Sequence, residues 1–280
     1  MFKSSDVADY YNTTQNHYER WWNLKDQLSL HYGIWESNTK KFAEALVNTN
    51  ATLLKEAEIE STDLVLDAGC GVGGAALFVH DKTGASVTGL TLSQKQLQTA
   101  RNAALQKGIQ DQVQFEIMDF TQTTFPDESF DVIWACESVC HVPDKRDFIQ
   151  ESFRLLKKGG RLVLFDFFQA KENQSDPNNW MHKWAQTWAV DRFASIETFS
   201  SQLKSADFSH VETHDYTQQI KLSAKKLYYA SLLAAIPSET YNLLHPNVSR
   251  FAKTHYRCGY YQYKALQKDL WKYFLVKAVK

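Results

Sequence analysis

The sequence predicts an α/β protein with a doubly wound, seven-stranded, mostly parallel sheet and an α-helical cover. Three observations carry this prediction. Short apolar runs alternate with polar helical stretches between Leu64 and Phe168. Those runs are nearly continuous in apolar residues, as strands covered on both faces require. Hydrophobic residues make up 44% of the 280 residues, which is ordinary for a globular protein with a large core.

Seven strands are expected along the chain. The first five are DLVLDAG, ASVTGLTL, QVQFEIMDF, FDVIWACE and RLVLFDFF. Further on, TFSSQLKSADFSHVETHDY predicts a helix and a sixth strand that return to the sheet, and WKYFLVKAVK predicts the last strand. In an open sheet of this kind, ligands bind at the carboxyl ends of the strands.

Two of the connecting helices have clear ends. One begins with Ser93 as its N-cap and Gln96 as the capping partner three residues on, and stops at Gly108. The other follows Asp144 and is expected to end at Gly159–Gly160. It places three apolar side chains on one face, those of Phe148, Leu155 and Leu156.

The aromatic residues divide the chain into a core and a cover. They are concentrated before position 43 and after 165, where they either fill a core or line an apolar pocket. We therefore expect six segments of four kinds: a helical N-terminal cover at 1–58, a ligand-binding core at 59–170, helical lids at 171–193 and 221–265, and returns to the sheet at 194–220 and 266–280.

Charge and hydropathy exclude several classes of protein. The 31 basic and 32 acidic side chains give a net charge of -1, which offers no general attraction for nucleic acid. No apolar stretch approaches the roughly 18 residues of a membrane helix, and Met1 to Tyr11 lacks the apolar run of a secretory signal. We expect a cytoplasmic protein with no stable membrane insertion; homo-oligomer formation is left open.

The four cysteines are expected to be free thiols. They are Cys70, Cys136, Cys140 and Cys258, and no two of them form a CxxC pair. Cys136, Cys140 and His141 could be imagined as metal ligands, but a fourth ligand at recognisable spacing is lacking. We therefore expect no metal.

A glycine loop ends the first strand and opens a helix in LVLDAGCGVGG. Gly69, Gly71 and Gly73 allow a tight turn and a close approach to a ligand. Gly69, Gly71 and Gly74 also match the GxGxxG of dinucleotide-binding proteins. Asp67 decides between the two, because its carboxylate would repel a pyrophosphate and attract an ammonium or sulfonium group. S-adenosylmethionine (SAM) carries both of these cations.

Acidic residues close two later strands. Asp119, with Phe120 beside it, is placed to accept a hydrogen bond from an adenine amino group while the ring packs on an apolar face. Glu137 would emerge near the methionine end of the same ligand. The alternative is that Asp119 and Glu137 only cap turns.

With its order and spacing, the stretch from Leu64 to Phe168 resembles class I SAM-dependent methyltransferases, whose fold is Rossmann-like. The segments ESVCHVPDKRDFIQESFRLLKKGGRLVLFDF, GLTLS, YYNTTQNHYERWW and HYGIWE resemble the small-molecule branch of that family. This branch contains tocopherol and sterol C-methyltransferases, sugar O-methyltransferases of natural-product pathways and mycolic acid cyclopropane synthases. The resemblance implies SAM as cofactor, bound by Asp67, Gly69, Cys70, Gly71, Gly73, Asp119, Phe120 and Glu137.

The sequence departs from the family pattern at the second strand. Class I enzymes usually carry an acid there that binds the ribose hydroxyls, whereas this chain has Thr91. The branch tolerates a similar GxTLS, so Thr91, the backbone at Leu92 or the Gln96 side chain is expected to serve the ribose. The same matching implies that three residues of the N-terminal cover lie over the cofactor: Tyr11, His31 and Tyr32.

The candidate catalytic residues follow the fourth and fifth strands. Methyl transfer is an in-line displacement that needs alignment and exclusion of water. For a hydroxyl acceptor, His141 could act as a general base and Asp166 could orient its imidazole, as the resemblance to sugar O-methyltransferases supports. Alternatively, His141 only caps a turn or contacts the cofactor, and Asp166 binds substrate.

Trp180, Trp184 and Trp188 recur every four residues and would share one helical face. They either pack in the core or line an acceptor pocket, and Tyr228 is open to the same two interpretations.

The favoured function is methyl transfer from SAM to oxygen or carbon of a medium-sized apolar or aromatic metabolite, such as a prenylated, polyketide or sterol-like compound. Three alternatives remain: a small-amine N-methyltransferase, a catalytically inactive SAM-binding regulatory subunit, and an NAD(P) oxidoreductase. SAM should stabilise the fold if the protein is either kind of methyltransferase or the inactive SAM-binding subunit. NAD(P) should stabilise it only if the protein is an oxidoreductase.

Overall fold

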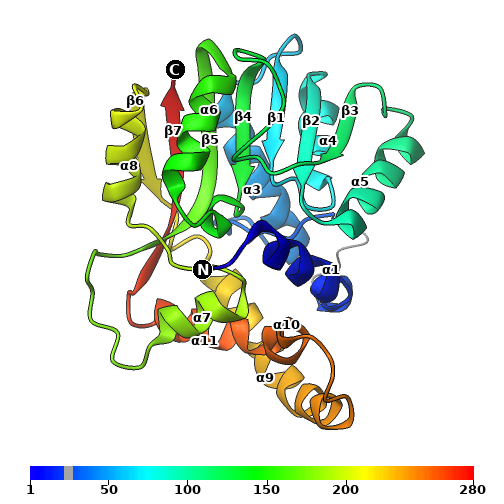
Figure 1. The fold of residues 1–280 in the computed structure, drawn as a ribbon, viewed down its shortest axis with the longest axis vertical. Coiled ribbons are helices and arrows are strands. Elements are labelled where there is room, and N and C mark those ends of the chain that lie inside the picture. The colour runs from blue at the N-terminus through cyan, green and yellow to red at the C-terminus, as the bar shows by residue number, and fades with distance from the viewer. Residues whose placement is uncertain (22–27) are drawn as a thin grey trace.

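The computed structural model of the chain describes residues 1–21 and 28–280, without the side chains of residues 16–21. Its centre is a seven-stranded sheet in the order β3-β2-β1-β4-β5-β7-β6 (Figure 1). Only β7 runs antiparallel to its neighbours. The predicted fold class is therefore confirmed. The strands are β1 (Leu64–Ala68), β2 (Ser86–Thr91), β3 (Val113–Ile117), β4 (Phe130–Cys136), β5 (Leu156–Gln169), β6 (Ser209–Asp215) and β7 (Trp271–Val279).

Helices cover both faces of the sheet, and the core is correspondingly split in two. One apolar cluster joins the sheet to α3 (Phe42–Ala57), α4 (Gly74–Thr83) and α5 (Gln94–Lys107). The other joins it to α6 (Lys145–Leu155) and α8 (Ile196–Ser205). Adjacent residues of one strand serve opposite clusters, as Val65 and Leu66 do in β1. This explains why the strands are continuous in apolar residues.

The start and end of α5 match the sequence prediction, with one correction. Ser93 is the N-cap and its side chain accepts a hydrogen bond from the Gln96 backbone N–H, while Gly108 ends the helix with φ +71°. The Gln96 side chain, however, is not the reciprocal cap. Its Oε1 accepts a hydrogen bond from the Thr91 hydroxyl at 2.8 Å, because Thr91 lies directly beside it at the end of β2.

The predicted end of α6 is wrong. The helix stops at Leu155 rather than at Gly159–Gly160. Leu156 already has extended dihedral angles and pairs with Phe130 of β4. Its apolar side chain fits a helix face as well as a strand, so periodicity alone could not separate the two; pairing with the sheet decides for the strand.

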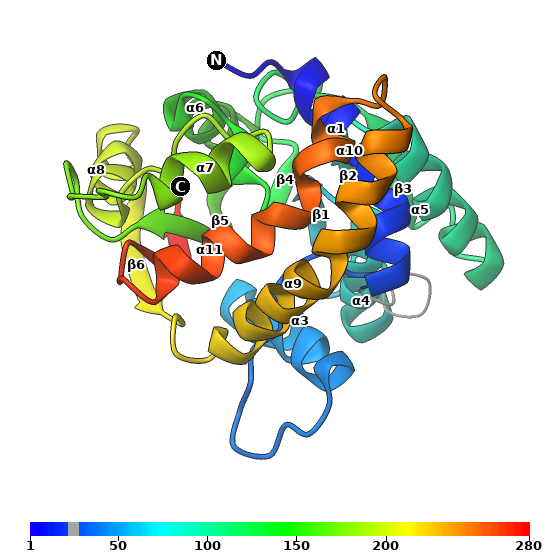
Figure 2. The same cartoon turned by 90° about the horizontal axis from the view of Figure 1, so that it is seen from below.

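The remaining helices lie beyond the carboxyl ends of the parallel strands (Figures 1 and 2). They are α1 (Ser4–Trp21), α7 (Trp180–Thr187), α9 (Lys221–Leu244), α10 (Arg250–Thr254) and α11 (Cys258–Leu266), with short 3-10 turns η1 (Val139–His141) and η2 (His255–Arg257). The last residue of the motif YYNTTQNHYERWW, Trp22, lies outside the described residues. Within the described residues, no helix has both the length and the apolarity needed to cross a membrane.

Candidate active site

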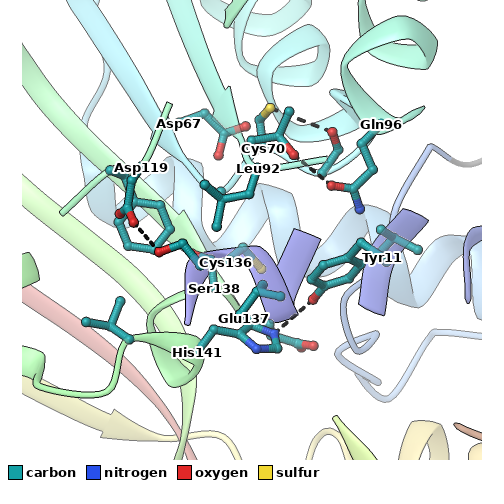
Figure 3. A pocket seen from close by; sticks show the side chains of 18 of the residues that line it. Tyr11, Asp67, Cys70, Leu92, Gln96, Asp119, Cys136, Glu137, Ser138 and His141 are labelled. Carbon is teal, nitrogen blue, oxygen red and sulfur yellow. Dashed lines mark hydrogen bonds between the residues drawn. The ribbon is translucent and has the colours of Figure 1, made fainter. Parts of the chain in front are cut away.

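A cavity of about 410 Å³ opens at the carboxyl ends of β1, β2 and β4, beneath α1 (Figure 3). Most of the residues that the sequence singled out line it: Tyr11, His31, Asp67, Gly69, Cys70, Gly71, Thr91, Leu92, Gln96, Asp119, Phe120, Glu137, His141 and Trp188. Six others do not line it, namely Tyr32, Gly73, Asp166, Trp180, Trp184 and Tyr228.

The three loop glycines have different tasks. All have positive φ, +95° at Gly69, +53° at Gly71 and +89° at Gly73. A Cβ on Gly69 would lie 2.4 Å from Ser138 Cβ, and one on Gly73 would lie 2.7 Å from the Phe115 ring. At Gly71 the nearest atom would be 3.4 Å away. Gly69 and Gly73 therefore let the loop pack against the protein, whereas Gly71 leaves the loop open toward the cavity.

Asp67, at the end of β1, is a buried carboxylate that reaches the cavity. Its Oδ2 atom has no hydrogen-bond partner among the described residues. Burial raises the pKa of this carboxyl to about 7. An unsatisfied buried oxygen of this kind is costly, and a cation with N–H donors bound beside it would remove that cost. The loop thus fits an ammonium-bearing ligand.

Glu137 follows β4 in a left-handed conformation, with φ +55°. Its Oε1 accepts hydrogen bonds from the Tyr32 backbone N–H at 2.7 Å and from the Tyr273 hydroxyl at 2.8 Å. Burial raises its pKa to about 8 despite these two bonds. Tyr32 therefore acts on the site through its backbone and through Glu137, since its ring packs in the core.

Asp119 is held in a tight local network. Its Oδ1 accepts hydrogen bonds from the backbone and hydroxyl of Thr121, at 2.9 and 2.7 Å, and its Oδ2 accepts one from Ser4 of α1 at 2.5 Å. It therefore caps a turn, as the alternative interpretation expected, while still lining the cavity. Phe120 beside it packs edge-on against Phe148 of α6.

Thr91 and Gln96 are coupled. The Thr91 oxygen accepts a hydrogen bond from the Ser93 backbone at 3.1 Å and its hydroxyl donates to Gln96 Oε1. The Gln96 amide nitrogen consequently faces the loop and would lie 3.9 Å from a Cβ on Gly71. Of the pair, Gln96 presents a donor to the cavity, and Thr91 orients it.

His141 is buried, and its two ring nitrogens have different partners. Nδ1 lies 3.3 Å from the carbonyl oxygen of Ala189, which can only accept, so Nδ1 carries the proton. Nε2 is then an acceptor, and the Tyr11 hydroxyl donates to it at 3.0 Å (Figure 3). Burial lowers the pKa of the imidazole to about 4. His141 is therefore neutral near pH 7, with its basic nitrogen on the cavity side.

The structure does not bring Asp166 and His141 together as a pair. Asp166 Oδ1 accepts a hydrogen bond from the Phe167 N–H at 2.7 Å and Oδ2 accepts one from the Cys140 N–H at 2.8 Å. The imidazole is oriented by the Ala189 carbonyl instead. Two backbone amides thus occupy the oxygens that the sequence interpretation assigned to histidine.

Lys145 completes the support of this turn, and sequence reasoning missed it. Its buried Nζ donates to the carbonyl oxygens of Cys140 at 2.9 Å and Val142 at 2.5 Å. Burial lowers its pKa, while Asp166 opposes that shift. Its place in HVPDK gave no signal beyond a helix start, because a lysine there ordinarily points to solvent.

The tryptophan stripe is mainly packing. Trp184 is fully buried and stacks on Phe193, while Trp180 packs on Tyr260 and Tyr261. Tyr228 lies in the same kind of cluster, against Tyr229, Tyr260 and Tyr263. Only Trp188 reaches the cavity, where its ring stands edge-on to His141 at 5.2 Å. Trp188, which directly follows the helix, still stacks on Trp184, and both rings pack edge-on against Phe167.

The cavity wall is acidic and apolar. Besides Asp67, Asp119 and Glu137 it contains Asp147, and among the lining residues that the structure describes the single lysine or arginine is Lys3. Further wall residues came without a sequence signal, among them apolar ones from the N-terminal segment and from the residues after η1: Phe2, Val7, Val142 and Pro143. The described ranges 1–21 and 28–280 contain no group of histidine, cysteine or carboxylate side chains arranged to hold a metal ion.

Residues 66–164 match a family model described as a methyltransferase domain. This match and the sheet order agree with the methyltransferase domain that the glycine loop predicted for the centre of the chain.

Two curated relatives show the range of enzymes that share this domain. The chain is 37% identical over 153 residues to 27-O-demethylrifamycin SV methyltransferase of Amycolatopsis mediterranei, covering 54% of this chain and 56% of the relative. It is 36% identical over 159 residues to 2-methyl-6-phytyl-1,4-hydroquinone methyltransferase of a Synechocystis strain, covering 55% and 49%. The matched region therefore spans about half the length of these relatives.

Solved structures are similar over almost the whole chain. The [4+2]-cyclase SpnF has a TM-score of 0.82 at 22% identity, covering 99% of this chain and 96% of that one. A geranyl diphosphate methyltransferase in complex with GPP and sinefungin has a TM-score of 0.80 at 20% identity, covering 99% and 98%. At such identities the likeness concerns the fold, including the helical cover.

Proposed function

We propose that this chain is a SAM-dependent methyltransferase acting on a small molecule. The observation that carries the proposal is the unpartnered Oδ2 of Asp67, buried at the open glycine loop of an acidic cavity. A dinucleotide would place its pyrophosphate against this carboxylate, and no arginine is found among the described residues that line the cavity, which argues against the NAD(P) alternative.

In this proposal Asp67 binds the ammonium group of the cofactor and Glu137 supports that end from the other wall. Gln96 and the backbone at Leu92 serve the ribose, and Asp119 and Phe120 hold the adenine. The cofactor supplies an electrophilic methyl group when bound. Tyr11, His141 and Trp188 close the opposite wall and exclude water from the line of transfer.

The acceptor that we propose is an uncharged apolar or aromatic metabolite methylated on oxygen or carbon. The relatives named for rifamycin and phytyl hydroquinone substrates support this class. In the cavity, Trp188 and Val142 offer apolar surface, and Nε2 of neutral His141 would accept a hydroxyl proton once the acceptor displaces the Tyr11 hydroxyl that donates to it. A small amine is less favoured, because no aromatic cage is formed by the Trp180 and Trp184 rings, which pack elsewhere.

We also propose the division into a core at 59–170, a cover at 1–58, 171–193 and 221–265, and returns to the sheet at 194–220 and 266–280. The position of α1, α7, α9 and α11 beyond the strand ends supports it, whereas α3, which falls within 1–58, packs on the face of the sheet. A cytoplasmic location remains part of the proposal, supported by four free cysteines.

The test is methyl transfer itself. The protein is incubated with SAM labelled in the methyl group and a library of phenols, polyketides, prenylated quinols and amines, and products are identified by mass spectrometry. Thermal shift with SAM, S-adenosylhomocysteine (SAH), NAD and NADP runs in parallel. Stabilisation by NAD but not SAH would overturn the proposal. SAH binding without labelled product from any pool would favour the inactive SAM-binding subunit.

A further inference from the structure

Exposed apolar side chains are concentrated on one helix, α9. Thirteen large hydrophobic residues are exposed in the described part of the chain, and eight of them belong to α9. Exposed apolar side chains that gather on one surface often mark an interaction site. Figures 1 and 2 show α9 at the outer edge of the helical cover, with one side turned away from the body.

Five of these residues form what we call the docking stripe, since their spacing of seven, four, three and seven positions puts them on one helical face. Its three most exposed members are Leu233, Ile236 and Leu243, at 71%, 80% and 82%. The opposite face packs on α11, where Ser231 approaches Gly259 closely. The stripe consists of Leu222, Tyr229, Leu233, Ile236 and Leu243.

The segment around the stripe is strongly basic. Residues 221–264 contain seven lysines and arginines and a single acid, Glu239, a net charge of +6 in a chain whose total is -1. The basic residues are Lys221, Lys225, Lys226, Arg250, Lys253, Arg257 and Lys264. Two copies of this face would repel each other, whereas an anionic surface would attract it.

We propose that the docking stripe binds the surface of an anionic phospholipid bilayer. An apolar helical face bordered by lysines is the pattern of helices that lie in the bilayer interface: the leucines enter the headgroup boundary and the lysines reach anionic headgroups. The helix lies flat on the membrane and does not cross it.

Contacts within the cover connect α9 to the cavity. Asn242 at the end of α9 donates a hydrogen bond to the Lys253 carbonyl of α10 at 3.0 Å. Phe251 of α10 packs edge-on against Tyr10 of α1, the neighbour of Tyr11 in the cavity wall. If the proposed function holds, docking brings the cavity side of the molecule to a lipid phase in which an apolar acceptor dissolves. Binding to the bilayer itself does not depend on that function.

The first experiment compares two sets of variants in flotation assays with vesicles. The vesicles are pure phosphatidylcholine or phosphatidylcholine with about a third of phosphatidylserine. The test variant carries Leu233→Ser, Ile236→Ser and Leu243→Ser together. The matched control carries Val47→Ser, Leu105→Ser and Ile117→Ser, three exposed apolar residues on other elements. We expect the wild type and the control to bind anionic vesicles and the test variant to bind at least tenfold more weakly.

A second pair separates charge from apolar contact. Lys221→Glu with Lys225→Glu reverses two charges beside the stripe, and Lys158→Glu with Lys204→Glu reverses two exposed charges elsewhere. We expect the first pair and 0.5 M NaCl each to weaken binding to anionic vesicles, and the second pair to leave it unchanged. Absence of vesicle binding by the wild type, or equal binding by both serine triples, would overturn the proposal.

Sedimentation velocity tests the alternative that the docking stripe binds a second copy of the chain. A wild-type dimer that the stripe triple converts to monomer would assign the stripe to a second copy of the chain and refute docking to lipid. Thermal shift with SAH on the same preparations keeps the two proposals apart: loss of SAH binding by the wild type would overturn the methyltransferase function without changing vesicle binding.

Discussion

At the scale of single residues, hydrogen-bond satisfaction distinguishes the two buried acids Asp67 and Asp166. Asp67 and Asp166 both lie in the last residues of parallel strands, Asp67 in β1 and Asp166 three residues before the end of β5. Both are buried, and burial raises the pKa of each, to about 7 and about 6. Two backbone amides satisfy both oxygens of Asp166, whereas Oδ2 of Asp67 has no partner in the described residues. We therefore assign Asp166 to the scaffold and Asp67 to the ligand.

The first prediction concerns Asp67→Asn. Loss of a hydrogen bond to a charged group costs roughly 1.5–3 kcal/mol, so SAH affinity should fall about tenfold to a hundredfold. The ligand-free variant should be at least as stable as the wild type at pH 8, because it no longer ionises a buried acid. Isothermal titration calorimetry and thermal denaturation measure the two effects. Asp111→Asn, at an exposed position with the same loss of charge, serves as control; equal affinities in the two variants would contradict the assignment.

The second prediction concerns His141→Gln. Because Nε2 is the basic atom on the cavity side, its loss should lower turnover of a hydroxyl acceptor by about 10²- to 10⁴-fold, with SAH affinity changing less than threefold. With the pKa of His141 at about 4, the wild-type rate should show no inflection near pH 6.5 due to this residue. Steady-state kinetics over pH 5–9 and calorimetry give both readouts. Parallel losses in rate and affinity would reduce His141 to a cofactor contact.

At the scale of elements, the η1 turn is the least conventional part of the site. Three residues carry His141 into the cavity, and the turn is too short to hold itself in place. Asp166 binds its backbone from β5, and Lys145 binds the carbonyl oxygens of Cys140 and Val142 from the start of α6. The strand and the helix thereby fix the position of the imidazole.

The third prediction follows for Lys145→Met. The variant keeps the volume of the side chain but leaves two buried carbonyl groups without their charged donor, which should cost about 2–4 kcal/mol of unfolding free energy. Urea denaturation measures it. Lys158→Met, at an exposed position, should change stability by no more than about 0.5 kcal/mol. A loss of less than 1 kcal/mol in Lys145→Met would show that water replaces the ammonium group.

How far the sequence predicts each element depends on how local its causes are. The N-cap Ser93 and the stop Gly108 were predictable because neighbouring residues decide them. The end of α6 was not, because Leu156 becomes a strand residue only by pairing with Phe130, 26 positions earlier in the chain. The prediction that Asp166 orients the His141 imidazole failed for a similar reason. The orienting group is the backbone carbonyl of Ala189, and a sequence does not indicate which backbone groups will lie beside a side chain.

At the scale of the whole molecule, the parallel sheet gathers several ionisable groups at one edge and buries them there. Three acids, Asp67, Glu137 and Asp166, have pKa values raised by burial to about 7, 8 and 6 from ordinary values of 3.8, 4.5 and 3.8. In each case the folded chain binds a proton that the unfolded chain has already released, so stability falls as pH rises toward the folded pKa. His141 acts in the opposite sense, and only between about pH 4 and its ordinary value of 6.5.

The fourth prediction combines these signs. Between pH 6 and pH 8 Asp67 and Glu137 together should lower the unfolding free energy of the ligand-free protein by about 2–4 kcal/mol, and His141, whose unfolded form releases its proton in the lower part of this range, should offset about 1 kcal/mol of that. SAH should reverse the trend, because its ammonium group binds the ionised form of Asp67, so its affinity should rise over the same interval. Urea denaturation and calorimetry at pH 6, 7 and 8 measure both effects. In Asp67→Asn the rise in affinity should disappear; an unchanged rise would mean that a group other than Asp67 binds the cation.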